Sequence, residues 1–119
     1  MCKRGDVYFA DLGIDPDGSK QAGVRPVIIV SNDKANTYSP VVTVVPLTAQ
    51  QHKKGSQPTH VYIPRHCGGL SRPSVALAEQ VVSVNKSQLL DYKGSIGNSP
   101  LMKKVTTALQ IQIGAAPST

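Results

Sequence analysis

Short apolar runs separated by turn-forming residues make up the first two thirds of the chain. Positions 5–12 (GDVYFADL) alternate between two faces, with Val7 and Phe9 on one of them, as in a half-buried strand. Positions 24–33 (VRPVIIVSND) and 39–48 (SPVVTVVPLT) carry longer β-branched runs, which are typical of strands covered on both sides. Pro46 indicates a bulge or a sheet edge near the end of the second run. The pattern therefore predicts three strands in this part of the chain.

Two more strands are predicted further along. Positions 59–64 (THVYIP) alternate, with Val61 and Ile63 on one face. Positions 74–84 (SVALAEQVVSV) mix alanines and a glutamate with several valines, and the valines favour a strand over a helix. The segments between the strands, at 13–23, 49–58 and 65–73, are rich in glycine, proline and polar residues and are predicted to be loops or turns.

The clearest helix is predicted at 99–114. Ser99 is suited to the N-cap, Pro100 to the first helical position and Gly114 to the C-terminal stop. One apolar face is expected to contain Leu101, Val105, Leu109 and Ile113. Positions 85–90 are predicted to form a short helical turn. Short strands followed by one amphipathic helix indicate a mainly β fold, a small and strongly curved antiparallel barrel with the helix packed on it. Barrel closure would leave no exposed sheet edges.

Length and charge limit the choice further. The 119 residues form one domain, 1–119, and neither a membrane-spanning apolar run nor a signal sequence is visible, so a soluble, cytoplasmic protein is expected. The net charge of +6 favours a polyanionic partner, either nucleic acid or an acidic protein segment. The two cysteines, Cys2 and Cys67, belong to no CxxC or Cys/His cluster and are expected to be free thiols.

Familiar catalytic motifs do not occur in the sequence. His52, His60 and His66 stand singly, without metal-ligand spacing or a carboxylate at a catalytic spacing, and are interpreted as surface residues. A Ser–His–Asp or Cys–His site whose members meet only in space stays open, with Cys67 as the best-placed nucleophile. No glycine-rich phosphate loop is found. The residues therefore indicate no metal and no cofactor.

Arg25 and Thr48 stand at the ends of the two longest apolar runs. Pro26 excludes the helical backbone for Arg25, whose guanidinium can donate two hydrogen bonds to a phosphate. If the strands at 24–33 and 39–48 are neighbours, the guanidinium and the Thr48 hydroxyl could share a cleft and hold one phosphate group. An ordinary surface arginine and an ordinary strand-forming threonine are the alternatives, and position alone favours them.

Four segments of the chain are informative in combination: KRGDVYFADL, GVRPVIIVSND, VVTVVPLT and SVALAEQVVSVNKSQL. Together they resemble the MazF/PemK (EndoA-like) family of type II toxin–antitoxin endoribonucleases, and the resemblance extends from Lys3 to Leu109. The resemblance, strongest to the Gram-positive branch, implies a small SH3-like antiparallel β-barrel of the CcdB/PemK type that works as a homodimer. It also implies metal-independent, sequence-specific cleavage of single-stranded mRNA, without a cofactor. Attack by the 2′-hydroxyl would leave 2′,3′-cyclic phosphate and 5′-hydroxyl ends.

The same resemblance implies roles for individual residues. Arg25 and Thr48 match the catalytic arginine and threonine of the family. The positions that match RNA-contacting or groove-bordering residues are Lys20, Gln21, Asn32, Gln57, Pro58, Ser74, Glu79 and Gln80. A MazE-like antitoxin is the implied partner, with an acidic C-terminal segment that covers the RNA site.

Some positions depart from the family pattern. Val82 and Asn85 stand where charged residues are common, and Lys20 stands where an acid is common, which leaves the cleaved sequence and the antitoxin open. Two other functions stay open: a CcdB-like toxin that binds gyrase without catalysis, and a nucleic-acid-binding barrel. A binding barrel would be expected to offer several aromatic platforms. The residues Tyr8 and Tyr62 lie in predicted strands and are interpreted as packing residues.

Overall fold

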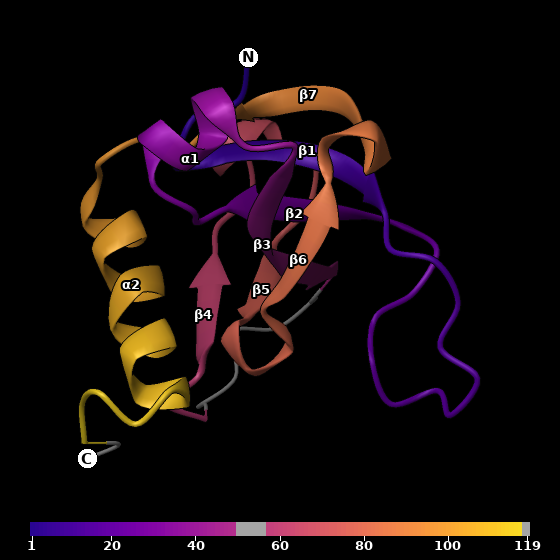
Figure 1. Ribbon diagram of the computed structural model, residues 1–119. Coiled ribbons are helices and arrows are strands. Elements are labelled where there is room, and N and C mark those ends of the chain that lie inside the picture. The colour runs from indigo at the N-terminus through magenta and orange to yellow at the C-terminus, as the bar shows by residue number, and fades with distance from the viewer. Residues whose placement is uncertain (50–56, 118–119) are drawn as a thin grey trace.

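Figure 1 shows a curved antiparallel sheet with a long C-terminal helix beside it. The structure is a computed structural model and describes residues 1–49 and 57–117. Its strands are β1 Asp6–Asp11, β2 Val24–Ile29, β3 Val41–Ala49, β4 His60–Ile63, β5 Ser74–Leu77, β6 Val82–Asn85 and β7 Leu89–Ser95. Its helices are α1 Asp33–Tyr38 and α2 Pro100–Gln112, and its 3-10 turns are η1 Cys67–Gly69, η2 Ala78–Gln80 and η3 Lys86–Gln88. The mainly β fold with a C-terminal helix is confirmed.

Strand β3 is the centre of the sheet. It pairs with β2 along one edge and with β6 and then β5 along the other. The order across the sheet is β4-β5-β3-β2-β1-β7, with β6 also on β3, and every pair is antiparallel. The single strand predicted at 74–84 is in fact two strands, β5 and β6, separated by η2. β5 pairs with the end of β3 and β6 with its beginning.

The sheet is open, so the expectation of a closed barrel is wrong. Within the described residues, β4 and β7 are the two ends of the sheet order and form no ladder with each other. The η1 turn packs against β7 instead: a Cβ added to Gly69 would lie 1.9 Å from the carbonyl oxygen of Lys93. Strand β4 has only four residues. Close backbone packing by the turn that follows β4 thus replaces strand-to-strand hydrogen bonds on this side.

The sheet separates two hydrophobic cores. Along β3, Val45 and Leu47 belong to the first core, whereas Val42 and Val44 belong to the second. This alternation confirms that 39–48 forms a strand covered on both sides. The first core is covered by α2 through Met102, Val105 and Ala108. The second core includes Ala10, Val27, Ile29, Val84 and the free thiol of Cys2.

Helix α2 begins and ends close to the predicted positions. The Ser99 side chain accepts a hydrogen bond from the Met102 amide, and Gly114 follows the helix with a φ of +78°. Ile113 does not lie on the buried face as predicted: it is 72% exposed, at the C-cap beyond the last helical residue. No helix in the described part of the chain is long and apolar enough to cross a membrane.

Two elements were not predicted from the sequence. Strand β2 ends at Ile29, and a short helix, α1, follows it because the Asn32 side chain caps the Ala35 amide. Strand β7 occupies 89–95, where only the helical turn at 85–90 was expected; that turn is η3. Leu90 and Tyr92 of β7 are exposed, so β7 lacks the apolar pattern of a core strand and is defined by its ladder to β1.

Candidate functional site

The register of β2 and β3 directs Arg25 and Thr48 to the same face of the sheet. The recorded pairs are Val27 with Pro46, Ile28 with Val45 and Ile29 with Val44. The ladder ends at Val27 and Pro46; Arg25 lies two residues before Val27 and Thr48 two residues after Pro46. Residues two apart in a strand point to the same face, so both side chains lie on the face of the Val27–Pro46 pair. The guanidinium and the hydroxyl therefore share the face that carries the second core.

Both side chains keep polar atoms available. Arg25 is exposed, and its Nε donates to the carbonyl oxygen of Ala22 at 3.1 Å, which orients the guanidinium. Among the described residues, neither the two terminal nitrogens of Arg25 nor the hydroxyl of the half-buried Thr48 has a recorded hydrogen bond. A guanidinium held by Nε with two free nitrogens can bind a phosphate through two parallel hydrogen bonds.

Thr48 belongs to a row of side chains that crosses four strands. It pairs with Val75 of β5, and Val75 pairs with Tyr62 of β4. We call Arg25, Thr48, Val75 and Tyr62 the end row. Every member is exposed or half-buried, whereas the next residues inward on β2, β3 and β5, Val27, Pro46 and Leu77, are buried. The end row is therefore the accessible margin of this face.

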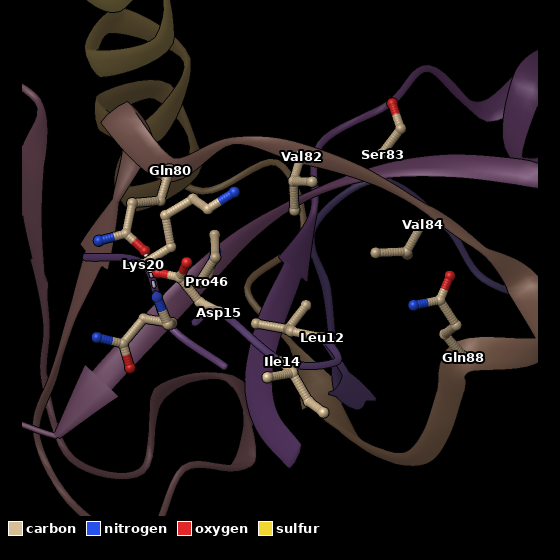
Figure 2. A pocket seen from close by; sticks show the side chains of 11 residues that line it. Leu12, Ile14, Asp15, Lys20, Pro46, Gln80, Val82, Ser83, Val84 and Gln88 are labelled. Atoms are coloured by element: carbon tan, nitrogen blue, oxygen red, sulfur yellow. Dashed lines mark hydrogen bonds between the residues drawn. The ribbon is translucent and has the colours of Figure 1, made fainter. Parts of the chain in front are cut away.

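A pocket of about 120 Å³ adjoins the end row. Figure 2 shows Pro46, two residues before Thr48, among its lining side chains, with Gln80 and Lys20 nearby. The lining residues are Leu12, Ile14, Asp15, Lys20, Gln21, Pro46, Gln80, Val82, Ser83, Val84 and Gln88. A single water molecule needs roughly 10–15 Å³ of such space, so the pocket has room for a group larger than one water molecule.

The loop between β1 and β2 forms one wall of this pocket. In Figure 1 it projects from the sheet. Its base is closed by hydrogen bonds from the Leu12 amide to the Gly23 carbonyl at 2.9 Å and from the Gly23 amide to the Gly13 carbonyl at 2.7 Å. The arm of the loop that returns to β2 is tied to η2, because the Gln21 amide donates to Oε1 of Gln80 at 2.7 Å. Oε1 of Gln21 is buried and has no hydrogen-bond partner in the described residues.

The charged groups of the loop also hold its shape. The Lys20 amide donates to Oδ2 of Asp15 at 2.6 Å, and this hydrogen bond is the main cause that lowers the pKa of Asp15. The Lys20 side chain is exposed at the pocket. An ammonium group at this position favours an anionic ligand.

Glu79 is held by two neighbours on the β4 side. Oγ1 of Thr59 donates to Oε1 of Glu79 at 2.9 Å, and Nε2 of His60 lies 2.8 Å from Oε2. Partial burial by itself raises the pKa of Glu79, but the hydrogen bonds from His60, the backbone and Thr59 outweigh it, and the pKa is lowered. His60 was interpreted as a surface residue; it is half-buried, and its carboxylate partner lies 19 positions away in sequence.

The structure brings five of the ten predicted site residues to one region. Lys20, Gln21 and Gln80 line the pocket, and Arg25 and Thr48 belong to the end row beside it. Glu79 is adjacent to Gln80 in η2, but its carboxylate is engaged with Thr59 and His60.

The other four residues lie elsewhere. Asn32 caps α1 beyond the opposite end of β2 from Arg25, seven residues away in sequence. Ser74 is 4% exposed and alternates with Val75, so it faces the other side of the sheet from Thr48. Gln57 and Pro58 are exposed and precede β4. His52 and most of the predicted loop at 49–58 lie outside the described residues.

Sequence reasoning missed three features of this region. Tyr62 and Val75 join Thr48 only through the β3–β5–β4 register, and the His60–Glu79 contact depends on the same pairing. One sequence signal for Tyr62 was available: the alternation of β4 puts Tyr62 on the opposite face from Val61 and Ile63. No group of three His, Cys, Asp or Glu side chains that could hold a metal occurs in the described residues.

The fold, an open antiparallel sheet with a C-terminal helix, has solved counterparts. A structure described as an endoribonuclease in complex with its cognate antitoxin, from a mycobacterial species, superposes with a TM-score of 0.77 at 30% identity and 98% coverage of both chains. The fold is thus that of a toxin endoribonuclease of this architecture.

Sequence comparisons identify the family. A family model for the PemK-like, MazF-like toxins of type II toxin–antitoxin systems matches residues 3–113, and this chain belongs to that family. Endoribonuclease EndoA of Bacillus subtilis is 46% identical over 113 residues, which are 95% of each chain. Endoribonuclease MazF of Staphylococcus saprophyticus is 41% identical over 114 residues, 96% of this chain and 92% of that one.

Proposed function

We propose that this chain is a toxin endoribonuclease that cleaves single-stranded mRNA at a short sequence without a metal ion. The observation that carries the proposal is the β2–β3 register, which directs the Arg25 guanidinium and the Thr48 hydroxyl to one accessible face. The pocket beside them and the net charge of +6 suit a polyanionic strand. Relatives at 41–46% identity carry the name endoribonuclease.

The proposed reaction uses the ribose of the substrate as the nucleophile. The 2′-oxygen forms a bond to phosphorus, the bond from phosphorus to the 5′-oxygen breaks, and a 2′,3′-cyclic phosphate and a 5′-hydroxyl result. Arg25 binds two phosphoryl oxygens and stabilises their developing charge, and Thr48 donates one more hydrogen bond. Arginine remains protonated in proteins, so Arg25 does not serve as the base; water accepts the 2′-hydroxyl proton and supplies one to the leaving oxygen.

The partners follow from the same site. We expect a homodimer in the cytoplasm and an antitoxin with an acidic segment. A chain of negative charges would be attracted to Arg25 and Lys20 and would exclude RNA from the end row. The mycobacterial relative described above was solved with its cognate antitoxin.

The test is cleavage of a long single-stranded RNA in EDTA, with the new ends mapped. Discrete cuts are expected, and Arg25→Ala should lower the rate about a hundred- to a thousandfold. The matched control is Lys104→Ala, which removes one positive charge from an exposed site on α2 and should cut normally. Uncut RNA from the unaltered protein, or full activity of Arg25→Ala, would refute the proposal. Uncut RNA together with stalled gyrase would favour the CcdB-like alternative.

A further inference from the structure

Gln80 of η2 holds the loop between β1 and β2, and the proposed cleavage gives it no part in the chemistry. We propose that Gln80 is a positioning residue that sets the direction of the Arg25 guanidinium through the loop segment Gln21–Ala22, an inference that rests on the proposed RNA cleavage. Its side-chain carbonyl holds the arm of the loop, and the backbone of that arm holds Arg25. In this role Gln80 acts on the bound phosphate only through Arg25.

The direction of the guanidinium depends on one carbonyl group of the loop. Nε of Arg25 donates to the Ala22 carbonyl oxygen at 3.1 Å, so the plane of the guanidinium follows this oxygen. Pro26 keeps the backbone of Arg25 extended but does not restrict the end of its long side chain. The position of the Ala22 carbonyl therefore decides where the two terminal nitrogens point.

The Ala22 carbonyl lies between two anchors. It shares a planar peptide unit with the Gly23 amide, which donates to the Gly13 carbonyl oxygen at 2.7 Å just after β1. On the other side, the Gln21 amide donates to Oε1 of Gln80 at 2.7 Å. The first anchor lies within the hairpin of β1 and β2, whereas the second joins the loop to a different part of the fold.

The contact between Gln21 and Gln80 is singular among the contacts of this loop. Within residues 1–49 and 57–117, it is the one recorded hydrogen bond from positions 13–23 to an element other than β1 and β2. Figure 2 shows the Gln80 side chain directed from η2 toward the loop residue Lys20. Without this contact the arm is held only at its base, so the arm can turn and carry the Ala22 carbonyl with it.

The η2 turn is a firm support for the Gln80 side chain. Ala78 is buried in the first core, and its amide donates to the Thr59 carbonyl oxygen at 3.0 Å. Glu79 accepts a hydrogen bond from Oγ1 of Thr59 at 2.9 Å, and its other oxygen lies 2.8 Å from Nε2 of His60. The core and β4 thus hold the turn from two sides, and the loop arm is anchored to the packed body of the protein.

The direction of the guanidinium matters because the proposed chemistry needs two parallel hydrogen bonds to one phosphate. These bonds form only when the donor plane is aligned with the phosphoryl oxygens. A displacement of about 1 Å in a group that contacts the reacting atoms can lower a rate about a hundredfold. Arg25 stabilises the transition state, so its misdirection lowers kcat, whereas the loss of a direct RNA contact made by Gln80 would mainly raise KM.

The experiment compares Gln80→Ala with Gln80→Glu. Glutamate keeps an acceptor for the Gln21 amide but lacks the terminal amide group that could donate to RNA directly. Values of kcat and KM are measured on an RNA that contains the mapped cleavage site, and NMR relaxation gives the order parameter of the Arg25 Nε–H bond. The matched control is Gln110→Ala, because Gln110 is an exposed glutamine on α2.

Gln80→Ala should lower kcat about 10- to 100-fold with KM nearly unchanged, and it should lower the order parameter of the Arg25 Nε–H bond. Gln80→Glu and Gln110→Ala should retain both kcat and the order parameter. A lysine has no Nε–H group that follows the loop. In an Arg25→Lys protein, therefore, Gln80→Ala should cause no further loss of kcat.

A loss of kcat in Gln80→Glu as large as that in Gln80→Ala would overturn the inference, and so would an unchanged order parameter in Gln80→Ala. A rise in KM alone would assign Gln80 to direct RNA binding, and a full further loss in the Arg25→Lys protein would show that Gln80 does not act through Arg25. Cleavage by the unaltered protein with normal kcat in Gln80→Ala refutes this inference alone. Absence of cleavage by the unaltered protein refutes it together with the proposed function.

Discussion

The packing of η1 on β7 can be tested by adding a single methyl group. Gly69 has a φ of +75°, and a Cβ at this position would lie 1.9 Å from the Lys93 carbonyl oxygen and 2.7 Å from its carbon. Gly114 has nearly the same φ, +78°, but a Cβ there meets nothing within 4 Å. The two alanine variants therefore share the backbone strain and differ in the steric overlap.

The expected losses follow from these two terms. A left-handed backbone costs an alanine roughly 1–2 kcal/mol, and the smaller conformational freedom of the unfolded chain returns about 0.4–1 kcal/mol. Gly114→Ala should therefore lower the free energy of unfolding by about 1 kcal/mol. Forcing a methyl group into packed backbone typically adds about 1–3 kcal/mol or more. Gly69→Ala should lose about 2–5 kcal/mol in total, because the overlapping atoms are backbone atoms that no side-chain rotation can move.

Urea denaturation followed by circular dichroism measures this difference. With a slope of about 2 kcal/mol per molar urea, the midpoint should fall by about 1–2.5 M for Gly69→Ala and by about 0.5 M for Gly114→Ala. All proteins are compared at one concentration, since association would shift the midpoints. Equal midpoints for the two variants would refute the close approach of η1 to β7 that holds this side of the open sheet.

Three further outcomes are expected. Thr48→Val keeps the shape of the side chain but should lower RNA cleavage about a hundred- to a thousandfold, with Thr48→Ser retaining activity; equal rates would remove the hydroxyl from the mechanism. Because the pKa of Glu79 is lowered, its contribution to stability is present above its ordinary pKa of 4.5 and is lost as pH falls through the lowered value. The unaltered protein should therefore lose more stability on acidification below about pH 4.5 than Glu79→Gln, as thermal melts at several pH values will show. Gln80→Ala removes the acceptor of the Gln21 amide, so this amide should exchange its hydrogen faster, while the core amides stay protected.

Part of the candidate site could be predicted from the local sequence pattern. Arg25 and Thr48 were found from strand-end positions and from a family resemblance, and β2 and β3 are neighbours as that reasoning required. Not all of the predicted groove residues lie at the site. Asn32 caps a helix at the far end of β2, and Ser74 points to the opposite face of the sheet. Residue type and sequence position do not reveal the face on which a side chain will lie when register and caps decide it.

The sequence by itself determined the strands with strong alternation, the helix between Ser99 and Gly114, and the basic character of the surface. These properties are local: they depend on side-chain periodicity, on capping groups and on the number of charges. The tertiary structure decided the open sheet, the weakly patterned β7, the contact of His60 with Glu79 and the end row from Arg25 to Tyr62. Each of these depends on which strands pair and in which register, and pairing is selected by the packing of the whole chain.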